Sequence, residues 1–219
     1  MENLEAYTDR LLLRRLVSNE LGGRDLEAFH QVWSSEQATQ WLSRGPCKDE
    51  LESQAWMAGI LPSSSPGITK ISYAVFHRTP KTSPSSPEMG NQGSGWEAVG
   101  IITLLPIQSP VPVADEAPNP ERRILELGYL FLPTAWGRGY ATESLRELLR
   151  LCRHDDDGVA PGEVVETDVR ANVERENVKS VRVVEKLGFH EVGEFEVDNK
   201  RESSEGKKKI TVVQYRRLV

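Results

Sequence analysis

Two glycines, Gly137 and Gly139, lie between an apolar segment and a segment with helical periodicity. Residues 124–132, ILELGYLFL, predict a strand, and residues 145–152 place apolar side chains at i, i+3, i+4 and i+7, as on the buried face of a helix. The first turn of a helix has backbone amides without intrahelical acceptors and carries a partial positive charge. Glycines just before it expose those amides. The junction therefore predicts either a site for a phosphate or pyrophosphate or a tight turn that binds nothing.

The glycine pair does not fit the two common nucleotide-binding loops. A P-loop requires Gly-Lys-Ser/Thr after four spacer residues, and this chain has no such stretch there. A dinucleotide fingerprint requires a third glycine three positions after the second, where the chain has Thr142. Neither kind of nucleotide site is favoured.

The composition limits the classes of function. A chain of 219 residues with 38% hydrophobic and 27% charged residues suits one soluble globular domain. A net charge of −6 argues against a nucleic-acid partner but leaves a cationic or amine substrate open. Two cysteines and four scattered histidines make neither a disulfide framework nor a metal-site spacing, so no metal is expected. With an acidic N-terminus and no apolar run of ~20 residues, we expect a cytoplasmic protein without a membrane partner; its oligomeric state stays open.

Hydrophobic patterning predicts an α/β domain over residues 1–219. The expected strands are 8–16, 71–76, 96–105, 124–132, 164–171, 190–197 and 209–218, and the expected helices are 24–33, 48–61, one from about 139, and 177–189. Segments rich in Pro, Ser and Gly interrupt this pattern near 78–95 and 106–123. They cannot bury apolar surface, so we expect mobile insertions, the first within a long hairpin. Gly188 is expected to end its helix in the left-handed conformation.

The stretch LELGYLFLPTAWGRGYATESL, residues 125–145, resembles the acetyl-CoA signature of the GNAT superfamily of N-acetyltransferases. TDRLLLRRL near the start, NVKSVRVVEKLGF near the end and the closing strand pair resemble more narrowly the branch that acetylates ribosomal-protein N-termini. The chain departs from the superfamily signature at Thr134, where the family has Gln or Arg. The resemblance implies a GNAT fold, with a mixed, mostly antiparallel sheet flanked by helices and with splayed fourth and fifth strands.

The same resemblance implies acetyl-CoA as the acyl donor, with its pantetheine arm between the splayed strands. Backbone groups of Leu130 and Leu132 would pair with that arm. The pyrophosphate would lie against the amides of Trp136, Gly137, Arg138, Gly139, Tyr140, Ala141 and Thr142. The Arg138 side chain would add positive charge or face solvent, and Asn177 would touch the cofactor or cap its helix.

Acetyl transfer requires a neutral amine, hydrogen-bond donors for the tetrahedral oxyanion and a proton for the departing thiolate. Many GNAT enzymes take that proton from a tyrosine at the position that is Val184 here. The resemblance to the ribosomal branch assigns it instead to Ser180, which follows Asn177 by one helical turn; the alternative is an ordinary helix serine.

Glu126 is the first candidate for the general base, working through a water, and its alternative is a solvated carboxylate. Asp168 and Glu166 on the next strand are weaker candidates. Tyr129 has opposite strand parity to Glu126, so we expect it to pack or to face the other side of the sheet.

The sequence thus predicts an N-acetyltransferase that acts on a primary amine, with a protein or peptide α-amine as the first candidate. A small-molecule amine, such as a polyamine, an amino acid or a drug, is the alternative acceptor. A non-catalytic acyl-CoA-binding domain is the alternative from another class of protein.

Overall fold

The computed structural model describes residues 4–42, 44–62, 70–79, 95–107, 122–152, 166–199 and 209–219. Its strands are β1 (Glu5–Tyr7), β2 (Leu11–Arg15), β3 (Ile71–Arg78), β4 (Trp96–Pro106), β5 (Arg123–Phe131), β6 (Thr167–Glu174), β7 (His190–Asp198) and β8 (Lys209–Leu218). Its helices are α1 (Arg24–Trp33), α2 (Glu36–Thr39), α3 (Glu50–Met57), α4 (Tyr140–Cys152) and α5 (Val178–Lys186), with a short 3₁₀ helix at Pro133–Ala135.

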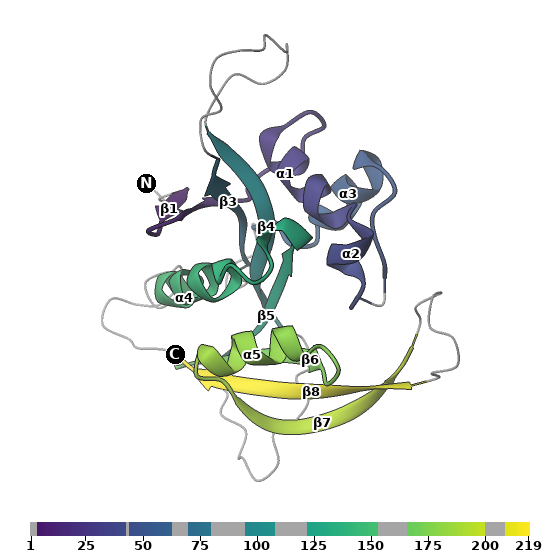
Figure 1. The fold of residues 1–219 in the computed structure, drawn as a ribbon, viewed down its shortest axis with the longest axis vertical. Coiled ribbons are helices and arrows are strands. Elements are labelled where there is room, and N and C mark those ends of the chain that lie inside the picture. Colours follow the sequence, from purple (N-terminus) through teal and green to yellow (C-terminus); the bar gives the residue numbers. More distant parts are fainter. Residues whose placement is uncertain are drawn as a thin grey trace.

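The described strands form one sheet in the order β1-β2-β3-β4-β5-β6-β8-β7 (Figure 1). All neighbouring pairs are antiparallel except β5 and β6, which are parallel. This confirms a mixed, mostly antiparallel sheet. The parallel pair is short, because β5 residues 123–126 pair with β6 residues 167–170 and the two strands then separate. The predicted splay therefore begins after Glu126.

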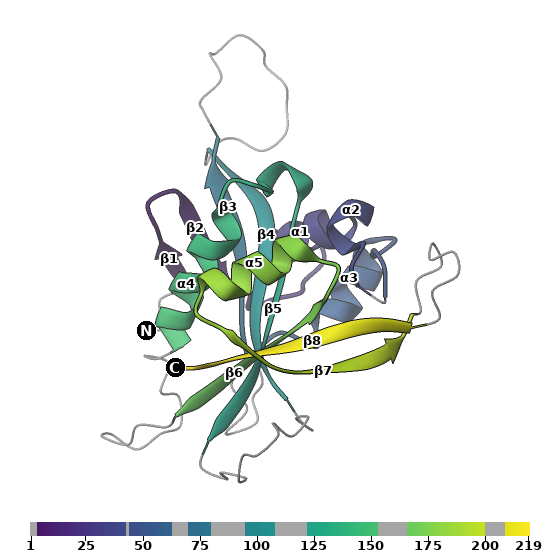
Figure 2. The same ribbon diagram turned by 60° about the horizontal axis from the view of Figure 1, so that its bottom comes forward.

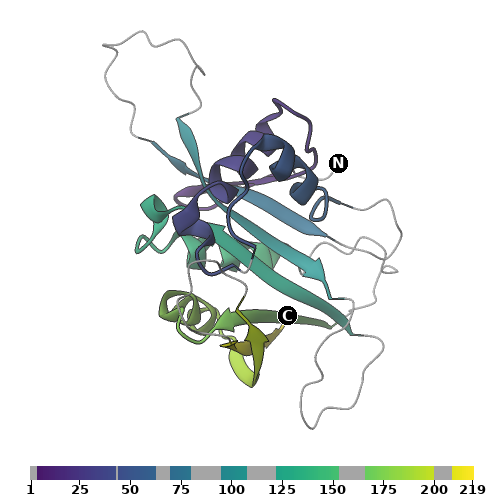
Figure 3. The ribbon, with the colours of Figure 1, turned by 90° about the vertical axis from the view of Figure 1, so that its right-hand side faces the viewer.

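Helices cover both faces of this sheet. Helices α4 and α5 lie on one face, where they share a core with alternate residues of the central strands (Figure 2). Helices α1 to α3 lie on the other face, over β3, β4 and β5 (Figure 3). The amphipathic pattern of α4 explains its place, since Leu145, Leu148 and Leu149 are buried while Arg146 and Arg150 are exposed.

The sequence pattern located most elements to within a few residues but missed the shortest ones. Strand β1 and helix α2 were not predicted, because three or four residues are too few to show a period. Helix α3 is shorter than the expected 48–61. It starts after Asp49, which accepts from the Glu52 amide, and ends where Gly59 and Ile60 donate to carbonyls three residues back.

The hairpin of β3 and β4 is confirmed, with Thr79 N–H donating to Gly95 O at 2.8 Å. The expected insertions fall largely on residues 80–94 and 108–121, which lie outside the described residues. The strand expected at 164–171 is described from Thr167 and continues to Glu174; residues 164 and 165 are also outside. Gly188 has a φ of 78° directly after the last turn of α5, as predicted.

Candidate active site

An open cavity of about 1150 Å³ lies where β5 separates from β6, between the glycine turn and α5. Ten of the predicted site residues line it: Glu126, Leu130, Trp136, Gly137, Gly139, Tyr140, Ala141, Thr142, Asn177 and Ser180. Leu132 and Arg138 are not among the lining residues. Residues far apart in the sequence thus meet around a space large enough for a ligand bigger than a typical drug.

The turn before α4 exposes backbone amides to this cavity. Gly137 and Gly139 have φ angles of 73° and 80°, in the left-handed region that favours glycine. In the described part of the chain, the first amide of α4 with a backbone acceptor is that of Glu143, which donates to Gly139 O at 3.0 Å. The amides of residues 137–142 precede it without a backbone acceptor in the described part of the chain and are available to an anion, and the positive end of the helix dipole points the same way. The Trp136 amide, expected in the same group, instead donates to Pro133 O at 3.1 Å.

The backbone groups that β5 presents at its free edge belong to other residues than expected. Leu132 N–H donates to Val99 O at 2.9 Å, and Ile107 N–H donates to Ile124 O at 3.3 Å. Even-numbered residues therefore direct their backbone groups to β4, since alternate residues of an antiparallel strand bond to the same neighbour. The backbone groups of Leu130 and Leu132, which the resemblance assigned to the donor arm, therefore point to β4 and away from the free edge.

The free edge is formed by the backbone of the odd-numbered residues Leu127, Tyr129 and Phe131. The Phe131 carbonyl already accepts a hydrogen bond from the Trp136 indole at 2.8 Å. Lys179 of α5 lies over the same indole, with Nζ 4.5 Å from the ring centroid. Trp136 thus connects β5, the glycine turn and α5. Lys179, which lies over its ring, places a positive charge at the cavity wall.

The start of α5 forms another wall. Asn177 caps the helix, because its Oδ1 accepts from the Ser180 amide at 3.2 Å. The Ser180 hydroxyl makes a short hydrogen bond with the Tyr129 hydroxyl, and Tyr129 also contacts Ser180 O at 3.2 Å. Burial raises the pKa of Tyr129 to about 12, while its bond to Ser180 acts in the opposite direction. The phenol is therefore a proton donor at neutral pH and not a base.

Tyr129 was not predicted as a site residue. Strand parity placed it on the face opposite Glu126, and its side chain indeed packs against the core under α4 and α5. That face carries α5, so Tyr129 meets Ser180 at the cavity. No sequence spacing shows this pairing, since 51 residues separate the two.

The candidate bases have different surroundings. Glu126 is exposed, lines the cavity and accepts from Asn172 Nδ2 at 3.0 Å. Asp168 is fully buried, with Arg170 Nη2 and Arg216 Nε each 3.1 Å from its carboxylate. It does not line the cavity and is not a suitable base, because two guanidiniums hold it as an ion pair.

Glu166 is also outside the lining residues and pairs with Arg122 at 2.6 Å. Among the three candidate bases, Glu126 alone lines the cavity.

Two further features are absent from the described part of the chain. Its residues include no group of three His, Cys, Asp or Glu side chains that could hold a metal ion. None of its helices is long and apolar enough to span a membrane.

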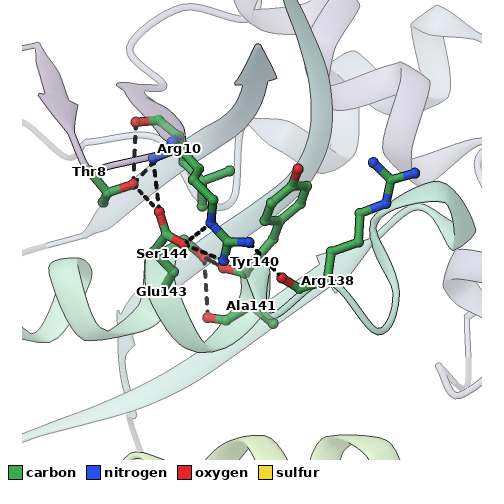
Figure 4. Close-up of polar contacts among 8 residues, drawn as sticks. Thr8, Arg10, Arg138, Tyr140, Ala141, Glu143 and Ser144 are labelled. Carbon is green, nitrogen blue, oxygen red and sulfur yellow. Dashed lines mark hydrogen bonds and ion pairs between the residues drawn. The ribbon is translucent and has the colours of Figure 1, made fainter. Parts of the chain in front are cut away.

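The turn is tied to the first hairpin of the chain. Arg138 is exposed, and its side chain points away from the Arg10 guanidinium while its carbonyl accepts from Arg10 Nη1 at 3.0 Å (Figure 4). Arg10 also pairs with Glu143 in the first turn of α4. Sequence reasoning did not identify Arg10 as part of the site.

Comparisons with known proteins show the family and the fold of this chain. The profile of the acetyltransferase (GNAT) domain matches residues 10–190. A GNAT-family acetyltransferase from Bacillus anthracis superposes with a TM-score of 0.60 at 19% identity, covering 98% of each chain. A spermidine N-acetyltransferase from Vibrio cholerae, solved with CoA and spermine, gives 0.61 at 16% identity over 96% of each chain. A GNAT-family acetyltransferase from Streptococcus pneumoniae gives 0.57 at 16% identity, covering 95% of this chain and 99% of that one.

The sequence has no significant match among curated proteins. At these identities the structural likeness establishes the fold, and the profile establishes the family. The protein is an acyltransferase. More narrowly, the chain belongs to the acetyltransferase (GNAT) domain family, whose members transfer the acetyl group of acetyl-CoA.

Proposed function

We propose that this chain is a single GNAT domain that transfers an acetyl group from acetyl-CoA to a primary amine, with a peptide α-amine as the preferred acceptor. The observation that carries the proposal is the meeting of three features in one cavity. These are the glycine turn with free amides, the free edge of β5, and the Tyr129–Ser180 hydroxyl pair at the start of α5.

The donor fits this arrangement from its chemistry. Its pyrophosphate is an anion, and the amides before α4 are donors at the positive end of a helix. Its pantetheine arm carries amides that can pair with an open strand edge, as an added strand does. The edge residues Leu127 and Tyr129 are suited to this role, because the β6 pairing ends at Glu126.

Glu126 is suited to accept a proton from the acceptor ammonium through a water. The neutral amine then attacks the thioester carbonyl, and the nitrogen of the tetrahedral adduct releases its extra proton to water. The adduct collapses to the amide with departure of the thiolate. Ser180 can donate its proton to that sulfur, and it recovers a proton from solvent afterwards. When Tyr129 donates its proton to the hydroxyl oxygen of Ser180, and not to the Ser180 carbonyl, the serine proton remains free for the thiolate.

The acceptor would enter beside Glu126. The cavity is also lined by residues 40–42, which follow α2, and by Glu174 and Glu176. Carboxylates at an entrance favour a cationic acceptor, and an ammonium group is cationic before deprotonation. The ribosomal-branch resemblance supports an α-amine among such acceptors.

A polyamine is the second candidate, because the Vibrio cholerae structure of similar fold is a spermidine N-acetyltransferase. A panel assay separates the candidates. The purified full chain is incubated with acetyl-CoA and, in turn, with peptides that have a free N-terminus, with spermidine and with amino acids. The CoA thiol released in each reaction is measured. We expect thiol release with the peptides. Release with spermidine alone would favour the polyamine, and CoA binding without release for any amine would contradict acetyl transfer.

A further inference from the structure

The glycine turn is held from outside the cavity by side chains of the β1–β2 hairpin. Arg10 donates through Nε and Nη2 to Glu143 Oε2, at 2.8 and 2.5 Å (Figure 4). Thr8 donates its hydroxyl proton to Glu143 Oε1 at 2.5 Å, and the Arg10 amide donates to the same oxygen at 3.2 Å. Both oxygens of one carboxylate are thus bound by a segment more than 130 residues away in the sequence.

These contacts fix both sides of the turn. Glu143 belongs to the first turn of α4, and its amide closes that turn by donating to Gly139 O. Arg138 lies between the two glycines, and its carbonyl accepts from Arg10 Nη1 at 3.0 Å. The Arg10 guanidinium also lies over the Tyr140 ring, 4.9 Å from its centroid. One side chain therefore contacts the turn, the first residue of the helix and its first carboxylate.

The contact between Arg10 and the Arg138 carbonyl determines the direction in which the Gly139 N–H points. No peptide bond in the described chain is cis, and in a trans peptide the C=O and N–H of one unit point in opposite directions. Because Arg10 holds the Arg138 carbonyl, the N–H of Gly139 points away from Arg10. Gly139 lines the cavity and Arg10 does not.

The electrostatics favour a persistent contact. The Glu143 side chain is only 18% exposed, whereas that of Arg10 is 50% exposed. Burial raises the pKa of Glu143, but the hydrogen bonds from Thr8 and Arg10 outweigh it and hold that pKa below its usual value. The carboxylate is charged at neutral pH, and a two-oxygen, charge-assisted geometry fixes orientation better than a single contact.

We propose that Thr8, Arg10 and Glu143 form a clamp that holds the glycine turn in the conformation that binds the pyrophosphate of the acyl donor. They are positioning residues and do not themselves touch the donor. The inference rests on the proposed function, because it assumes that the turn binds this group. It predicts that losing the clamp weakens binding only of donors that carry a pyrophosphate.

The test compares two acyl donors across a set of variants. Arg10→Met, Glu143→Gln and Thr8→Val each remove clamp contacts, and Thr8→Val does so without changing charge. The matched control is Arg150→Met, which breaks an ion pair with Glu147 on the same helix, away from the turn. Dissociation constants for CoA are measured by calorimetry. Values of kcat/KM are compared for acetyl-CoA and S-acetylpantetheine, which lacks the pyrophosphate.

We expect Arg10→Met and Glu143→Gln to weaken CoA binding at least fivefold and Thr8→Val to weaken it about twofold or more. The kcat/KM for S-acetylpantetheine should change less than twofold, and Arg150→Met should match the wild type. Equal losses for both donors would show a general structural role and overturn the clamp. An effect of Arg10→Met without any effect of Thr8→Val or Glu143→Gln would show direct attraction of the phosphates, which also overturns it.

The outcome separates the clamp from the function on which it rests. A wild-type chain that binds no CoA would refute the proposed function and the clamp with it. A wild-type chain that binds CoA, with variants that bind it equally well, would refute the clamp alone. Melting temperatures of all variants, which we expect within a few degrees of the wild type, show whether each one is folded.

Discussion

The hydroxyl of Tyr129 on β5 is hydrogen-bonded to the hydroxyl of Ser180 in the first turn of α5, at the wall of the cavity. The pair joins the two arms of the splayed sheet region, because β5 forms one side and α5 follows directly from β6. It also supplies two protons within one short hydrogen-bonded unit. A departing thiolate needs a nearby donor, so the pair is suited to that step.

Ser180→Ala should lower kcat at least tenfold while changing CoA affinity less than twofold, because a proton given to the thiolate matters only in the transition state. Tyr129→Phe should lower kcat by a smaller factor, since it removes only the partner of the serine. Steady-state kinetics and calorimetry measure the two effects. Ser53→Ala is the control, because Ser53 is a buried serine that bonds to His30, outside the cavity lining. A loss of CoA binding without loss of turnover would leave Ser180 a structural residue.

Gly139→Val should weaken CoA binding at least tenfold, about 1.4 kcal/mol. The residue has a φ of 80°, which a β-branched side chain tolerates poorly, and its added Cβ would lie 3.4 Å from Arg10 Nη2. Both effects displace the turn amides. Gly22→Val is the matched control, because Gly22 has a φ of 73°, no atom within 4 Å of an added Cβ and no place in the cavity lining. Unchanged CoA affinity in folded Gly139→Val protein would make the turn purely structural.

Glu126→Gln should reduce kcat/KM for the amine about tenfold or more at pH 7 and leave the dissociation constant of CoA within twofold. The amide keeps the shape of the side chain but cannot accept the ammonium proton. Glu166→Gln serves as the control, because Glu166 pairs with Arg122 outside the cavity lining. Equal activities of the two variants would remove Glu126 from the mechanism.

An α-amine should be acetylated in preference to a lysine side chain. Freeing the neutral amine at pH 7 costs about 1 kcal/mol for an α-amine and about 4.6 kcal/mol for lysine, from their ordinary pKa values. A single exposed carboxylate, Glu126, is better suited to the smaller free energy of deprotonating an α-amine. Peptides with a free N-terminus compete against peptides with a blocked N-terminus and an internal lysine, and mass spectrometry counts the products. Faster acetylation of the blocked peptides would reverse this assignment.

Glu143 should make the folded state sensitive to acid. Its pKa is lowered by folding, so its stabilising contribution is complete above the ordinary value of 4.5 and is lost as the pH falls through the lower folded value. Wild type should exceed Glu143→Gln in free energy of unfolding by about 1 kcal/mol at pH 7. The difference should shrink as the pH falls below 4.5. Urea unfolding at several pH values measures it, and a difference independent of pH would show that charge plays no part.

Much of the fold follows from local pattern in the sequence. The leucine spacing of α4, the alternation in β6 and the glycines at 137 and 139 each report on a few neighbouring residues, and the structure places the corresponding elements close to where they were expected. The cap of α5 is equally local, because Asn177 and Ser180 are one turn apart. Such features depend on backbone geometry over short distances, and residue types at fixed spacing encode it.

Register and distant contacts had to come from the tertiary structure. Which backbone groups of β5 face the open edge depends on the pairing with β4, which directs those of Leu130 and Leu132 to β4 and leaves those of their odd-numbered neighbours at the edge. Asp168 is unsuited to act as a base because it is buried outside the cavity lining and enclosed by Arg170 and Arg216. The sequence by itself determined the glycine turn and the family signature. The folded chain decided that Tyr129 meets Ser180 and that Arg10 meets Glu143, because each contact joins residues whose separation along the chain carries no period.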